Sequence, residues 1–171
     1  RSTALLTNRE AISKLAWLEF LGGDANLAID RLSESTAATT GAQRALNLYY
    51  RGAVLNAVGR NADALVSLNE AARESPDLIV VDQERGVALW QSCRREDAMN
   101  AWKRVSDASP NLPLTAAFLA AASTSAGDST NAAAFQRMAD RVMPADARYV
   151  WMVGLRLRSL GFKESADKYF M

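Results

Sequence analysis

Hydrophobic residues recur at helical spacing between residues 45 and 76, with a single break in the middle. The break falls at Gly59, and the apolar positions on its two sides are Leu48, Leu55, Leu65 and Leu68. Glycine permits a tight or left-handed turn, and a proline cannot continue a helix. The pattern therefore predicts two amphipathic helices that turn back on each other at Gly59 and end before Pro76.

The same punctuation recurs every 34 residues, which indicates an array of repeats and not one local turn. Four columns share this step: Pro76, Pro110 and Pro144; Ala64, Ala98, Ala132 and Ala166; Gly52, Gly86, Ala120 and Gly154; Gly59, Cys93, Gly127 and Gly161. An earlier copy, marked by Ala16, Gly23, Ala28 and Leu32, is offset by 36 residues. We place its two extra residues in the polar connection STAATTGA at 35–42.

Two local features refine the expected helices. A small residue at Gly52 is expected to let the second helix of its pair approach closely, with Ala64 as the facing small surface. Thr7 and Glu10 have the spacing of a capping box ahead of an apolar run, which predicts that the first helix begins there.

These repeats resemble the tetratricopeptide repeat, a family whose unit is a 34-residue pair of helices. The family's small, turn and proline columns are occupied by Gly52, Gly59 and Pro76, then by Gly86, Cys93 and Pro110, then by Ala120, Gly127 and Pro144. The resemblance implies an all-α fold, a right-handed superhelical solenoid of antiparallel helix pairs. It implies one array over 1–171, with repeats at about 9–44, 45–78, 79–112, 113–146 and 147–171.

Some positions depart from the family pattern. The first repeat has Thr40 where proline is expected, and the fourth has Gln136 in an apolar column with Phe135 beside it, so we expect these two repeats to pack less regularly. The fifth repeat stops within its second helix, just after Phe170. We therefore expect the chain to be a fragment of a longer protein, or its end to dock on a partner.

The resemblance also implies that the first helix of each pair lines a concave groove. Candidate groove residues are Trp17, Tyr49, Asn56, Gln83, Trp90, Gln91, Arg148, Trp151 and Arg158. Aromatic and amide side chains supply contact area and hydrogen-bonding groups for an extended peptide. Alternatively, the aromatic residues pack only against neighbouring repeats. That alternative is favoured for Trp17 and stays open for Trp90 and Trp151, whereas Trp102 falls in a core column.

Composition argues against several other classes of function. Lys and Arg number 20 against 19 Asp and Glu, with the signs interspersed, so a nucleic-acid partner is not expected. There is no histidine, and Cys93 is the single cysteine, so we expect no catalysis, metal site or cofactor, and a structural role for Cys93. The longest apolar run, at 114–122, is far shorter than the roughly 20 residues of a membrane-spanning helix, so this segment is not expected to insert into a membrane.

The leading hypothesis is a non-catalytic scaffold that binds a peptide segment or a partner subunit in its groove. The alternative is a structural spacer or self-assembling segment of a larger bacterial envelope, secretion or polysaccharide-export protein, with contacts between copies through the terminal repeats. The ratio of 16 arginines to 4 lysines favours a bacterial origin. The compartment stays open between cytoplasm and periplasm, the latter if the chain belongs to an envelope assembly.

One known binding mode of the family is not expected here. Repeats that capture the acidic tails of chaperones clamp a carboxylate with groove lysines, and none of the four lysines falls in a groove column. Arg148 and Arg158 are the candidates to hold an acidic group instead.

Overall fold

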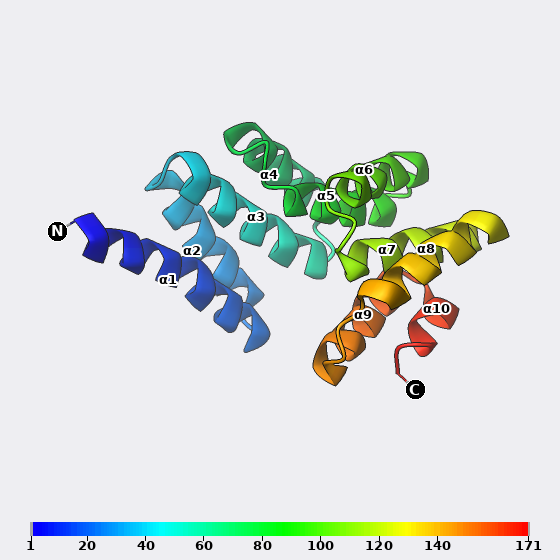
Figure 1. Ribbon diagram of the computed structural model, residues 1–171. Coiled ribbons are helices and arrows are strands. Elements are labelled where there is room, and N and C mark those ends of the chain that lie inside the picture. Colours follow the sequence, from blue (N-terminus) through cyan, green and yellow to red (C-terminus); the bar gives the residue numbers. More distant parts are fainter. Residues whose placement is uncertain (1, 171) are drawn as a thin grey trace. The chain divides into compact units, whose positions relative to one another are not determined.

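The computed structural model describes the backbone of residues 2–170 and the side chains of residues 12–170. This part of the chain contains ten helices and no strand, as the all-α prediction requires, and short turns join successive helices (Figure 1). The helices are α1 (Ser2–Leu21), α2 (Ala25–Ala37), α3 (Gly41–Ala57), α4 (Asn61–Glu74), α5 (Val80–Gln91), α6 (Arg95–Ala108), α7 (Pro113–Ser125), α8 (Ser129–Val142), α9 (Ala147–Ser159) and α10 (Lys163–Asp167).

The chain forms two compact units. The N-terminal unit comprises Arg1–Cys93 with helices α1 to α5, and the C-terminal unit comprises Arg94–Met171 with helices α6 to α10. Within the N-terminal unit α1 packs on α2 and α3 packs on α4, and within the C-terminal unit α7 packs on α8 and α9 on α10. Each unit thus contains two complete helix pairs and one further helix.

The turn column of the repeat marks left-handed backbone between paired helices. Gly59, Gly127 and Gly161 have φ angles of 78°, 74° and 86°, which confirms the turn predicted from their spacing. Cys93 occupies the same column with φ 61°, and it is exposed. The feature that all four residues share is therefore the left-handed backbone, and Cys93 shows that the side chain at this position can be exposed.

The ends of three helices agree with the proline column, but the start of the first helix differs from the prediction. Helices α4, α6 and α8 end two residues before Pro76, Pro110 and Pro144 respectively. Helix α1, however, begins at Ser2, so Thr7 lies inside the helix and the prediction of a capping box at Thr7 was wrong. The preceding stretch STALL contains neither glycine nor proline and includes good helix formers, so the helix extends through it.

Two glycines let helices pack at close range. A Cβ atom added at Gly52 would lie 2.5 Å from Leu68, and one added at Gly154 would lie 2.6 Å from Phe170. The close approach predicted at Gly52 is thus present, although the atoms that face Gly52 belong to Leu68 and not to Ala64. Ala64 lies in the same helix as Leu68, α4, and is fully buried.

The N-terminal unit combines an apolar core with a buried polar cluster. Leu32, Leu48 and Leu68 are among the fully buried side chains. Asn47, also fully buried, accepts a hydrogen bond from Ser13 Oγ at 2.5 Å. Its Nδ2 donates to Ser35 Oγ at 2.8 Å and to Thr39 Oγ1 at 3.1 Å, so one amide joins α1, α2 and α3 next to the connection that lacks a proline.

The C-terminal unit is built around α7, which is buried along residues 113–123. Trp102 of α6 and Phe118 of α7 are fully buried with ring centroids 5.1 Å apart, as the core column predicted for Trp102. Helix α8 buries only Ala139, in line with the looser packing expected of the fourth repeat. Gln136 Nε2 of α8 instead donates to the hydroxyl of Tyr169 at 3.2 Å.

Candidate partner-binding surface

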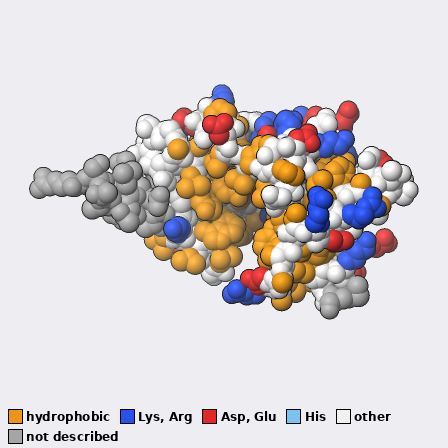
Figure 2. Space-filling model, in the orientation of Figure 1, with side chains coloured by type: hydrophobic (Ala, Val, Ile, Leu, Met, Phe, Trp, Pro, Cys, Tyr) orange, Lys and Arg blue, Asp and Glu red, His pale blue; other side chains and the backbone are white. Residues whose placement is uncertain are grey.

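The predicted groove residues of α1 and α3 form an aromatic cluster in the N-terminal unit. The ring centroid of Trp17 lies 5.3 Å from Phe20 and 6.0 Å from Tyr50, and Tyr49 and Tyr50 are 5.3 Å apart. All four side chains are half-buried and pack against the core of this unit. Figure 2 shows hydrophobic side chains gathered over the region of α3. The packing role favoured for Trp17 is therefore present, with part of each ring still accessible.

Other predicted groove residues of the N-terminal unit are buried. Asn56 is 1% exposed, and its Nδ2 donates to the backbone oxygen of Glu84 at 2.9 Å and to Glu84 Oε2 at 3.2 Å. Gln83 and Trp90 are also buried, with Trp90 6% exposed, whereas Gln91 is half-buried. Asn56 thus joins α3 to α5, and Glu84, which the sequence did not single out, is its partner.

In the C-terminal unit the predicted residues share one face of α9. Arg148, Trp151, Leu155 and Arg158 follow one another at intervals of three, four and three residues, the spacing of a single helical stripe. Trp151 is 56% exposed and Leu155 is 41% exposed. We call this stripe the α9 surface. It presents two accessible apolar side chains between two cations.

Local contacts hold the α9 surface in place. Trp151 meets Phe170 edge-on with ring centroids 6.3 Å apart, and the guanidinium of Arg158 lies 4.7 Å from the centre of the same ring. Arg158 also pairs with Asp167 at 2.7 Å, and Arg148 pairs with Asp146 at 3.0 Å. The hydrogen bond from the Arg148 side chain, followed by that from its backbone N–H, lowers the pKa of Asp146. Phe170, near the end of the chain, therefore contacts both Trp151 and Arg158 of the exposed stripe.

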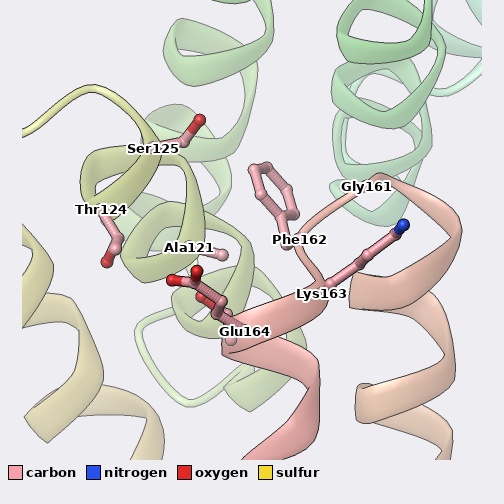
Figure 3. A pocket seen from close by; sticks show the side chains of 8 residues that line it. Ala121, Thr124, Ser125, Gly161, Phe162, Lys163 and Glu164 are labelled. Atoms are coloured by element: carbon pink, nitrogen blue, oxygen red, sulfur yellow. The ribbon is translucent and has the colours of Figure 1, made fainter.

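A hollow of about 360 Å³ lies beside the end of α7. Ala121, Thr124 and Ser125 of α7 form one wall, and residues 161–165 form the other (Figure 3). The side chains of Ala121, Thr124 and Ser125 are small and leave this space unfilled. The hollow is lined by hydroxyl groups, the Phe162 ring, Lys163 and Glu164, so it has mixed polar and apolar character.

Two further features concern metal ligands and membrane-spanning helices. No group of three or more His, Cys, Asp or Glu side chains among them is arranged to hold a metal ion. None of the helices described is both long enough and apolar enough to cross a membrane.

The fold is that of tetratricopeptide-like helix arrays. A solved structure described as the crystal structure of MamA has a TM-score of 0.66 and 19% identity, over 91% of this chain and 90% of that one. A MamA fragment from Desulfovibrio magneticus RS-1 has the same TM-score at 15% identity, over 95% and 90% of the two chains. The chain matches no protein-family model and no curated protein sequence. The similarity therefore establishes a tetratricopeptide-like fold, as the repeat columns predicted.

Proposed function

We propose that this protein is a non-catalytic interaction scaffold that holds a segment of a partner protein on the α9 surface. The observation that carries the proposal is the exposure of Trp151 in a groove column, fixed by its edge contact with Phe170. A large, held, accessible aromatic side chain is the usual anchor of a protein interface. The tetratricopeptide-like fold supports the same function, because stacked helix pairs present extended binding surfaces.

The partner segment is expected to carry an apolar side chain close to acidic groups. Trp151 and Leu155 supply the apolar contact, and Arg158 supplies a charged donor held over Phe170. Binding requires the partner's carboxylates to compete with Asp146 and Asp167 for the two arginines. The six predicted groove residues that lie in the N-terminal unit, among them Asn56 and Trp90, have no direct contact with the partner in this proposal.

The test is affinity capture from a bacterial lysate with the wild-type protein and Trp151→Ala, quantified by mass spectrometry. Loss of an anchor of this kind costs about 2 kcal/mol or more, so the captured partners should fall by roughly thirtyfold. Val66→Ala is the matched control, because Val66 is 65% exposed on α4 and lies outside the groove columns. Equal capture by Trp151→Ala and wild type would refute the proposal.

A second candidate, self-association through a terminal repeat, is supported by the exposed face of α1. Leu15, Leu18 and Leu21 of this helix are exposed, with Leu21 at 64%. Contiguous apolar side chains on a surface are typical of an interaction site. If copies associate through this face, sedimentation velocity will show a concentration-dependent shift for wild type and none for Leu18→Glu. A shift of equal size in both proteins would exclude this face.

A further inference from the structure

Seven of the fourteen arginines whose side chains the structure describes form an ion pair with a carboxylate within their own unit. The paired residues are Arg31, Arg44, Arg60, Arg85, Arg94, Arg148 and Arg158. Arg137 and Arg141 of α8 are different, since neither side chain has a hydrogen-bond or ion-pair partner among the residues that the structure describes. Both are exposed. Helix α8 therefore carries two exposed cations that have no partner in the described part of the chain.

These two arginines border one hollow. Ala134, Arg137, Met138 and Arg141 line a space of about 390 Å³ along α8. The arginines are four residues apart, which places them on the same helix face with about 6 Å between their Cβ atoms. Figure 2 shows Lys and Arg side chains over the region where α8 runs in Figure 1. We call this stripe the α8 surface, and it shares no residue with the α9 surface.

The one carboxylate of α8 is held elsewhere. Asp140 accepts a hydrogen bond from Gln136 Nε2 at 2.8 Å, and Gln136 also donates to Tyr169. Gln136, the polar residue in an apolar column, therefore forms hydrogen bonds in addition to packing loosely. Gln136 engages one oxygen of Asp140, and neither Arg137 nor Arg141 pairs with that carboxylate.

The floor of the hollow is apolar. Met138 is half-buried, and its sulfur accepts a hydrogen bond from Ser106 Oγ of α6 at 3.6 Å, which ties the thioether to the adjacent helix. Ala134 is too small to fill the space beside it. A flexible thioether next to a small residue suits an inserted aliphatic or aromatic side chain.

We propose that the α8 surface is a second docking site, which binds an acidic peptide segment of a partner protein with an apolar side chain inserted against Met138. Carboxylates of the segment would form charge-assisted hydrogen bonds with Arg137 and Arg141, whose planar guanidinium groups match that geometry. The site goes beyond the scaffold function assigned to the α9 surface, because it lies on a second helix of a repeat and uses different residues.

Charge and apolarity together favour a peptide over a phosphate-bearing polymer. A nucleic acid or an anionic membrane is attracted by a broad positive field, and this chain has a formal net charge of only +1. Two cations around an apolar hollow instead match a short segment that alternates acidic and apolar residues.

The test uses a fluorescein-labelled synthetic peptide in which glutamates flank a central leucine, measured by fluorescence anisotropy with the full chain. We expect saturable binding that weakens as salt is raised, because the Debye length falls from about 10 Å at 0.1 M to about 3 Å at 1 M. The double variant Arg137→Gln/Arg141→Gln should raise Kd by roughly tenfold or more. Met138→Gln should also weaken binding of the peptide. A control peptide in which glutamine replaces each glutamate should bind neither the wild-type protein nor the double variant.

Two controls separate this site from the others. Arg73→Gln removes another exposed arginine without a described partner, on α4, and should leave Kd unchanged. The same peptide also matches the α9 surface, so the assay is repeated in the Trp151→Ala background, where the α8 surface should still bind it and Arg137→Gln/Arg141→Gln should still raise Kd by roughly tenfold. The scaffold proposal is tested separately by affinity capture, so a failure of either proposal can be told apart from a failure of the other. No binding in the Trp151→Ala background, equal binding there by the protein that also carries the double change, or tighter binding of phosphatidylglycerol vesicles or a single-stranded oligonucleotide than of the peptide would overturn the proposal.

Discussion

The N-terminal and C-terminal units stack helices of the same repeat family by different means. Buried polar residues of the N-terminal unit include Asn47, Asn56, Gln83 and Glu84, whose groups need partners on other segments. In the C-terminal unit the buried polar residues described are Ser106, Thr115 and Ser123. A hydroxyl in a helix can bond the backbone of its own helix, whereas an amide needs several partners at fixed positions.

The two units therefore commit their side chains to packing to different degrees. In the N-terminal unit the amides of Asn47 and Asn56 join α3 to its neighbours at fixed positions. In the C-terminal unit, helix α8 buries a single residue, and exposed side chains are available on α8 and α9. The α8 and α9 surfaces both lie in the unit without a described buried amide cluster, where side chains are less committed to packing.

The largest expected effect comes from Asn47→Ala. The substitution leaves Ser13, Ser35 and Thr39 buried beside a small cavity, so we expect a loss of about 3 kcal/mol in the free energy of unfolding. Native-state hydrogen exchange should show the loss in amides of residues 12–93. The matched change Ser123→Ala in the C-terminal unit should cost less than about 1 kcal/mol. If the two variants lose the same stability, the contrast between the units is wrong.

The two close-approach glycines test how far each unit can adjust. In Gly52→Ala the new methyl group meets the branched carbon of fully buried Leu68, so we expect a net loss of about 1 to 2 kcal/mol. In Gly154→Ala it meets the outer ring atoms of half-buried Phe170, which can move, and the gain in helix propensity of about 1 kcal/mol offsets most of the cost. Urea unfolding measures the free energy of unfolding of both variants. A larger loss for Gly154→Ala than for Gly52→Ala would contradict the prediction.

The smallest expected effect is at the last residue of the N-terminal unit. Cys93 has φ 61°, a conformation that costs a non-glycine residue about 1 kcal/mol, so Cys93→Gly should stabilise the protein by up to about that amount. Thermal melting of Cys93→Gly beside Cys93→Ala separates backbone strain from loss of the thiol. Stabilisation by alanine alone would contradict the explanation.

Much of the fold follows from the sequence, because its signals are local. The left-handed backbone at Gly59, Gly127 and Gly161 is favoured by the absence of a Cβ atom. Helix ends before Pro76 and Pro110 depend on the missing N–H group of proline. The start of α1 was predicted wrongly because Thr7 and Glu10 match a capping box whether or not a helix continues ahead of them.

The binding surfaces were predictable only as columns. Trp90 and Trp151 were predicted from the same signal, a tryptophan in a groove column. In the structure Trp90 is 6% exposed and Trp151 is 56% exposed. The arginines of α8 were not predicted as a binding surface, because their exposure and their lack of partners among the described residues are set by the folded structure. Sequence spacing alone does not predict which donor will form a hydrogen bond with a carboxylate such as that of Asp140.

The sequence by itself determined the repeat length, the helix pairs and the turns between them, since each depends on backbone conformation within a few residues. The tertiary structure alone decided that Asn56 fastens helices, that Trp90 is buried, and that Trp151 remains accessible. The physical reason is that exposure and hydrogen-bond pairing are set by the volumes and polar groups of side chains on neighbouring helices. Those neighbours lie tens of residues away along the chain.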